Sequence, residues 1–118
     1  MSGETVINLD EANTIITLNP ASQLPTKLSS DNFPTWRAQL LTLLRGLDFL
    51  KFLDGTHPAP TADAPVADHR RWYRQDQLLL HSILASMSPG VAPYVSAATN
   101  SRQAWMTRYG TTPNKGQV

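Results

Sequence analysis

The chain has no cysteine among its 118 residues. This absence excludes disulfides, thiolate-bound zinc and a cysteine nucleophile, and it fits a reducing compartment. No uninterrupted apolar run is long enough to cross a membrane, and the first residues lack the basic start and apolar stretch of a secretory signal. We therefore expect an intracellular protein, in the cytoplasm or alternatively the nucleus, with no membrane partner.

Charge is also scarce, since only 16% of the residues are charged and the formal net charge is +1. Its distribution is uneven: Glu4, Asp10 and Glu11 precede the first basic residue, Lys27, so the first 26 residues are net negative and the remainder is net positive. A dedicated nucleic-acid binder usually carries a denser basic face. RNA contact is therefore expected to be weak, or to be supplied by many copies side by side.

Motifs for catalysis and metal binding are missing as well. The three histidines, His57, His69 and His81, do not have the i, i+4 spacing that lets two imidazoles share one metal. No serine lies in a G-x-S-x-G turn, and no glycine-rich phosphate loop follows a strand. We expect no enzymatic activity, no metal and no cofactor, because a nucleophile, a base and an oxyanion donor cannot be nominated.

Apolar residues are abundant, at 41%, and suffice for one domain of this length. The first helix is predicted to begin at the candidate N-caps of residues 30–32, with Pro34 in its first turn. Gly46 is expected to end or bend it, and a second apolar turn follows and stops at Asp54-Gly55. The apolar stripe recurs at spacings of three and four, through Trp36, Leu40, Leu43, Leu44 and Leu47.

A second long helix is predicted after the exposed, proline-rich connector "DGTHPAPTADAP", with Asp63 as a cap and Pro65 in the first turn. Beyond Pro89 we expect a short helix in "VAPYVSAA" and a last segment capped by Asn100 or Ser101. Together these elements predict a mainly α fold, a small bundle of three to five helices. The apolar face of the second long helix consists of Trp72, Leu79, Leu80, Ile83, Leu84 and Met87.

Residues 1–26 read as a polar, extended N-terminal arm. The β-branched residues near 14–18 favour a short strand, and Asn19-Pro20 and Leu24-Pro25 disfavour a helix. The expected organisation is this arm, a helical domain over 27–109 and a flexible tail over 110–118.

The segment "HRRWYRQ" places three arginines, Arg70, Arg71 and Arg74, around two aromatic residues that could stack on bases. A solvated helix face is the favoured interpretation, because Arg70 and Arg74 are four residues apart and Asp68 and Asp76 partly neutralise the cluster. The three arginines remain candidates for contact with RNA or with a partner. The three tryptophans, in three predicted helices, are expected to be core anchors.

Three blocks of the sequence, in order, resemble the N-terminal Gag region of plant copia-type (Pseudoviridae) LTR retrotransposons, the copia-like and UBN2-type gag polypeptide family. They are "KLSSDNFPTWRAQLLTLLRGLDFLKFLDGTHPAP", "WYRQDQLLLHSILASMSPGVAPYV" and "TNSRQAWMTRY". The resemblance implies a helical domain, of the capsid N-terminal type, whose copies assemble into a shell around element RNA. The positions that match the family motif or its core are Asn32, Trp36, Leu40, Leu44, Gly55, Trp72, Asp76, Leu80 and Trp105.

The chain departs from that family after Trp105, where Gly110 and Pro113 interrupt the expected helix and no zinc knuckle follows. Residues 33–55 carry apolar side chains on more than one flank, so we expect uncovered apolar surface and homo-oligomerisation. The leading hypothesis is a non-catalytic, Gag-derived domain acting in capsid-like self-assembly. The alternatives are a co-opted host regulator that binds other Gag-like or host proteins, and a weak RNA-binding module of a nucleocapsid-type assembly.

Overall fold

The computed structural model describes residues 15–107, and that part of the chain is mainly α-helical. The predicted small bundle of three to five helices is confirmed. The tail expected over 110–118 lies outside the described residues. The elements are α2 (Pro20–Gln23), α3 (Phe33–Leu47), α4 (Leu50–Asp54), α5 (Val66–Ala85), the 3-10 turn η1 (Ala92–Tyr94) and α6 (Ser101–Trp105).

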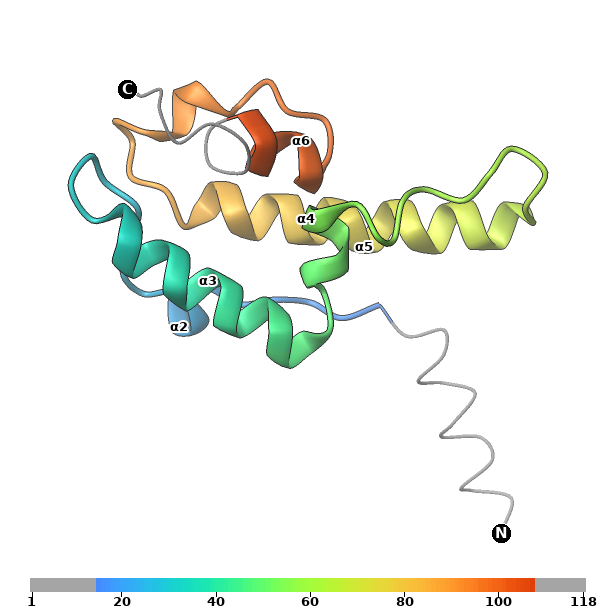
Figure 1. The fold of residues 1–118 in the computed structure, drawn as a ribbon, viewed down its shortest axis with the longest axis horizontal. Helices are drawn as coiled ribbons and strands as arrows, with labels where there is room; N and C mark the ends of the chain where they lie inside the picture. The colour runs from blue at the N-terminus through green and yellow to red at the C-terminus, as the bar shows by residue number, and fades with distance from the viewer. Residues whose placement is uncertain (1–14, 108–118) are drawn as a thin grey trace, which may run out of the picture.

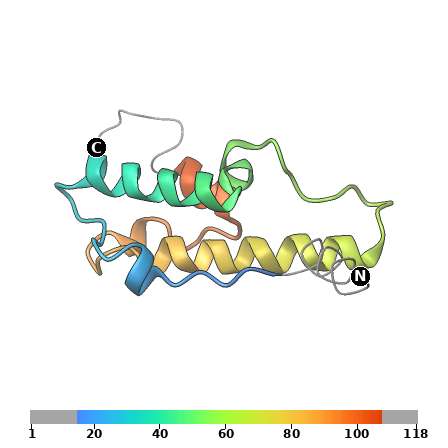
Figure 2. The same cartoon turned by 90° about the horizontal axis from the view of Figure 1, so that it is seen from below.

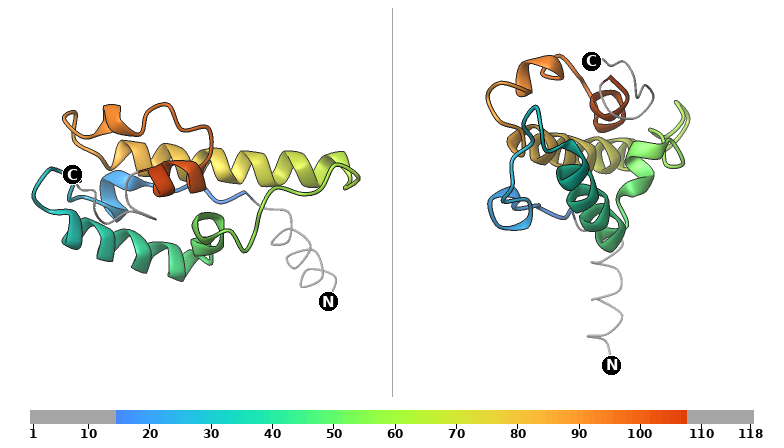
Figure 3. Two further views of the ribbon diagram at one scale, coloured as in Figure 1. Left: turned by 45° about the horizontal axis from the view of Figure 1, so that its top comes forward. Right: turned by 60° about the vertical axis from the view of Figure 1, so that its left-hand side comes forward.

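The long helix α5 is central to the arrangement. In Figure 1, α3 lies on one side of α5, and η1 and α6 lie on the other. The first half of α5 projects beyond α3 and α6, and the connector over residues 55–65 runs from α4 out to the tip of this half, as Figures 1 and 3 both show. The projecting half therefore has fewer covering elements than the second half.

The start of α3 is predicted correctly, but Asn32 works differently from a standard cap. Its Oδ1 accepts a hydrogen bond from the Ser29 backbone N–H at 2.7 Å, and its Nδ2 donates to the Lys27 carbonyl at 2.8 Å. Asn32 thus fixes the loop that leads into the helix. The helix ends one residue beyond Gly46, at Leu47, and closes at Asp48 in the left-handed region, with φ 62°, which agrees with the end predicted near Gly46.

The predicted stop at Gly55 is confirmed, and this glycine also lies against α6. Gly55 has φ +86°, which a residue with a Cβ adopts only with strain. The Arg102 guanidinium on α6 donates to the carbonyl of Leu53 at 2.9 Å. A Cβ at Gly55 would lie 2.7 Å from Nη1 of Arg102. Gly55 therefore ends α4 and leaves room for the contact between α4 and α6.

Residues 15–28 run along α5, but the strand expected near 14–18 does not form over residues 15–18. Instead, the Gln75 side-chain amide pairs with the backbone of Ile16: Ile16 N–H donates to Oε1, and Nε2 donates to the Ile16 carbonyl, both at 2.8 Å. Leu28 forms an isolated parallel bridge with Met87. The segment therefore runs in the same direction as α5, as Figure 2 shows. Thr14 lies outside the described residues.

The short helix α2 interrupts this segment, although the two proline steps predicted no helix there. Pro20 occupies the first helical position, where its missing N–H has no intrahelical partner. Leu18 and Leu24, on either side of the helix, are buried in the same core as α3 and α5. Residues 15–26 thus contribute to the packing of the helical domain.

The apolar residues of 33–55 lie inside, so the expectation that this stretch leaves much apolar surface uncovered is wrong for the described residues. Its side chains Leu43, Leu47 and Leu50 are partly buried and pack against the core. Over residues 15–107, the exposed large apolar side chains are Ile16, Val66, Tyr73 and Tyr94. The buried members of the stretch are Trp36, Leu40, Leu41, Leu44, Phe49, Phe52 and Leu53.

Candidate functional site

Trp36 joins α3 to the end of α5. Its side chain is fully buried, and its indole N–H donates to Ser86 Oγ at 3.1 Å. Ser86 Oγ in turn donates to the Ile83 carbonyl at 2.7 Å. The family-motif residues Leu40 and Leu44 are also fully buried on α3. These side chains therefore form the interior of the fold and line no accessible site.

Asp76 fastens α6 to α5. Its carboxylate, 1% exposed, accepts a hydrogen bond from the Ser101 backbone N–H at 3.1 Å, and Ser101 Oγ donates to the Asp76 carbonyl at 3.0 Å. Burial raises the pKa of Asp76, and this effect exceeds the opposing effect of the Ser101 hydrogen bonds. Asp76 is directed into the fold, so the expectation that it partly neutralises the arginine cluster is wrong. Leu80, one turn on, is buried on the same helix.

Replacing Asp76 with Asn should change how stability depends on pH. A carboxyl whose pKa is raised by folding contributes stability at acidic pH that is lost as pH rises through the raised pKa. The wild type should therefore lose stability relative to Asp76→Asn as pH rises from about 4, because the amide can still accept from Ser101 without a buried charge. Urea denaturation at several pH values measures the difference; a wild type that gains relative stability over that range would contradict the assignment.

The other two motif tryptophans differ in their surroundings. Trp105 is buried, and the Arg37 guanidinium lies 5.8 Å from its ring centroid, within cation–π distance. Trp72 is half-buried; its indole N–H donates to the His57 carbonyl at 2.9 Å, and its ring lies 5.7 Å from that of Phe52 at an interplanar angle of 31°. Trp105 thus belongs to the core, whereas Trp72 forms part of a surface groove.

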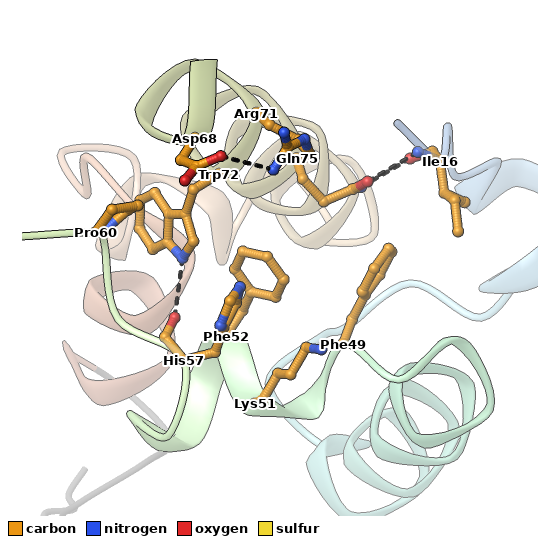
Figure 4. Close-up of a pocket in the computed structure, with 10 residues that line it drawn as sticks. All are labelled: Ile16, Phe49, Lys51, Phe52, His57, Pro60, Asp68, Arg71, Trp72 and Gln75. Carbon is orange, nitrogen blue, oxygen red and sulfur yellow. Dashed lines mark hydrogen bonds and ion pairs between the residues drawn. The ribbon is translucent and has the colours of Figure 1, made fainter. Parts of the chain in front are cut away.

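This groove, of about 480 Å³, lies between α4, α5 and the N-terminal segment. Figure 4 shows Phe49 and Phe52 projecting into it from one side, with Trp72 and Gln75 on the other and Ile16 at one end. It is the hollow where three segments distant in sequence meet. Its lining residues are Ile16, Phe49, Lys51, Phe52, His57, Pro60, Asp68, Arg71, Trp72 and Gln75.

Both signs of charge lie at the groove. Lys51 pairs with Asp48 at 3.1 Å, and Arg71 pairs with Asp68 at 3.3 Å, each within one turn of chain. Partial burial, and then the charge of Lys51, lower the pKa of His57, so its imidazole is neutral at neutral pH. No group of three or more potential metal-binding side chains occurs between residues 15 and 107. The groove therefore offers an apolar floor and mixed charges, which suit binding.

The three predicted arginines are brought together. Arg70, Arg71 and Arg74 line a hollow of about 210 Å³ with Ile15 and Ala67, and we call these five residues the arginine face. Within the described part of the chain, the ion pair with Asp68 is the one that these arginines make. Arg70 and Arg74 are exposed. Because Asp68 pairs with one of these arginines and Asp76 is directed to Ser101 instead, the arginine face carries more net positive charge than the sequence indicated.

The groove could not be predicted from the sequence, because most of the residues that line it belong to no motif. In the sequence, Phe49 and Phe52 indicate only a second apolar turn, and Lys51 and Gln75 belong to no motif. Phe49, the N-cap of α4, and Phe52 lie three residues apart on one side of this turn, and their ring centroids are 5.7 Å apart. That spacing is a local signal for an aromatic cluster, but it does not show that the cluster borders a groove.

Two curated proteins of Arabidopsis thaliana are similar to this chain, the retrovirus-related Pol polyproteins from transposons RE2 and RE1. Each is 39% identical over an alignment of 89 residues, and the match covers 70% of this chain and 6% of the polyprotein. The chain thus spans only a small part of the relatives that it matches. The similarity supports a retrotransposon origin.

The other comparisons give no further relative. No family model matches the chain, and no solved structure matches it. None of the helices described between residues 15 and 107 has the length and apolar character needed to cross a membrane.

Proposed function

We propose that the chain is a non-catalytic domain of a retrotransposon Gag-type polypeptide and acts by association between copies, in a capsid-like assembly. The observation that carries this proposal is the use of the motif residues within the fold. Trp36, Gly55, Asp76 and Trp105 all lie where helices meet or end, and the contacts of Trp36 and Asp76 are buried. Motif residues that hold helices together or end them specify a scaffold. This use of the motif fits a structural protein better than an enzyme.

The groove is the surface proposed for association, and a second copy of the chain is its proposed occupant. Its apolar floor is bordered by Lys51 and Asp48 on the α4 side and by Arg71 and Asp68 on the α5 side. Because both sides carry both signs, two copies related by a two-fold axis can place cations against carboxylates. A polyanion would instead meet the carboxylates of Asp48 and Asp68.

Reversing charges across the groove tests this surface. Lys51→Glu and Asp68→Lys should each weaken association, because each places like charges together at a two-fold contact. The double variant should associate at least as well as the wild type, since its α4 side is then negative and its α5 side positive. Sedimentation velocity from micromolar to millimolar concentration measures these effects.

Arg45→Glu is the matched control, because Arg45 is exposed on α3 and does not line the groove. It should leave association unchanged. Single reversals without effect, or a double variant weaker than both single variants, would contradict a two-fold contact at the groove.

A second candidate function is weak RNA contact, and the arginine face is the observation that favours it. Three cations lining one hollow can contact successive phosphates. The exposed Tyr73 lies beside them on α5 and presents an aromatic ring. The low net charge of the chain limits this contribution to a few phosphates per copy.

A further inference from the structure

The projecting half of α5 combines exposed apolar and basic side chains. Val66 is 73% exposed and Tyr73 is 57% exposed, and the positions of Val66, Arg70 and Tyr73 share one helix face. Arg74 extends the basic part of the same half. Three of the four exposed large apolar side chains of residues 15–107, including Ile16, lie on or beside this half. Such a surface fits a partner that is both acidic and apolar.

A segment with this chemistry occurs in the same chain. Residues 4–11, "ETVINLDE", which we call the acidic segment, carry three carboxylates with Val6, Ile7 and Leu9 between them, and no cation. The chain enters the described structure at Ile15, which itself lines the arginine face. Glu11 is four residues from Ile15, and an extended chain spans up to about 3.6 Å per residue. The acidic segment is therefore within reach of Arg70 and Arg74.

We propose that the acidic segment docks on the arginine face of its own chain and competes there with polyanions. The short connection gives the acidic segment an effective local concentration far above that of a separate molecule. Its carboxylates pair with Arg70 and Arg74, and its apolar side chains cover Val66 and Tyr73. An anionic polymer must displace it before binding. The inference is independent of assembly through the groove, because a monomer suffices for it.

A spin label tests the docking directly, and the lack of native cysteine makes a single label unambiguous. Asn8→Cys carrying a nitroxide should broaden the amide resonances of residues 66–74 more than those of α6. Glu4→Gln/Asp10→Asn/Glu11→Gln in the labelled chain should abolish this preference. The control Asp31→Asn/Asp54→Asn/Asp63→Asn changes the net charge by the same amount at exposed positions that line neither the groove nor the arginine face, and it should retain the preference.

Two results would overturn docking in cis. One is equal broadening of residues 66–74 in the two triple variants. The other is the same broadening in an unlabelled, ¹⁵N-labelled chain mixed with a nitroxide-labelled one, because that would place the segment of a second copy on this face.

Competition is tested with fluorescent polyuridylate by anisotropy at several salt concentrations. Neutralising the acidic segment should make the salt dependence of binding steeper than in the control triple variant, by about 1.4 in the logarithmic slope, about 0.7 for each freed arginine on a single strand. Arg70→Gln/Arg74→Gln should remove that difference. Equal slopes in the two triple variants, or a difference that survives without Arg70 and Arg74, would contradict the competition.

Discussion

Trp36→Ala should lower the free energy of unfolding by about 3–5 kcal/mol, the largest effect expected of any single substitution here. The whole indole ring lies in the core, so its removal leaves a cavity between α3 and α5 and deprives Ser86 Oγ of a donor. Small domains unfold with only about 5–15 kcal/mol. Urea denaturation followed by circular dichroism measures the loss.

The matched control is Tyr73→Ala, which also removes an aromatic ring but from a position that is 57% exposed. Its cost should stay within about 0.5 kcal/mol, as for most surface substitutions. Similar losses in the two variants would contradict the interior placement of Trp36.

Gly55→Ala and Gly46→Ala should have opposite effects on stability. Alanine at Gly55 is forced into the left-handed region at a cost of about 1–2 kcal/mol. Its Cβ also displaces the Arg102 guanidinium from the Leu53 carbonyl, which adds about 1 kcal/mol. Gly46 lies inside α3 with no atom within 4 Å of an added Cβ, so alanine there should stabilise by about 0.5–1 kcal/mol.

Thermal and urea unfolding of the two variants provide the comparison. Arg102→Ala in the background of Gly55→Ala separates the causes, because the conformational cost remains when the side chain that the Cβ meets is removed. A stabilising Gly55→Ala would contradict the described end of α4, and a destabilising Gly46→Ala of similar size would contradict the open space around Gly46 in α3.

Local signals explain why several helix ends were predictable. Asn32 in the loop before α3, Gly55 after α4 and Asn100 before α6 act within a few residues of the chain; Asn100 Oδ1, for example, accepts from the Gln103 N–H at 2.7 Å. Gly46 itself lies inside α3, one residue before the helix ends. A glycine inside a helix costs about 1 kcal/mol, and the burial of Leu44 and its neighbours offsets that cost.

Contacts between distant segments were not predictable. The pairing of Gln75 with Ile16 joins residues 59 apart in the sequence, and no local sequence pattern near either residue predicts it. It gives the Ile16 N–H and carbonyl the partners that a neighbouring strand would have supplied, and so the β-branched segment makes no strand. Arg102 on Leu53 is a second example, since it joins residues 49 apart.

In the candidate site, too, local groupings were predictable and contacts between distant segments were not. The sequence grouped Arg70, Arg71 and Arg74 correctly, because residues three and four apart share a helix face. The expected contact of Asp76 with the arginines is wrong. Helical spacing predicts the direction of Asp76 around α5, but it does not predict that α6 covers that side of the helix. The sequence also overestimated the exposed apolar surface of residues 33–55, because periodicity does not reveal how many neighbours surround a helix.

The mass of the wild-type chain in solution tests the proposed association most directly. Light scattering coupled to size-exclusion chromatography, with and without single-stranded RNA, measures that mass across a wide range of concentration. The account predicts a mass that rises with protein concentration in the absence of RNA, through contacts at the groove. A mass that stays at 13.0 kDa throughout, with and without RNA, would contradict it.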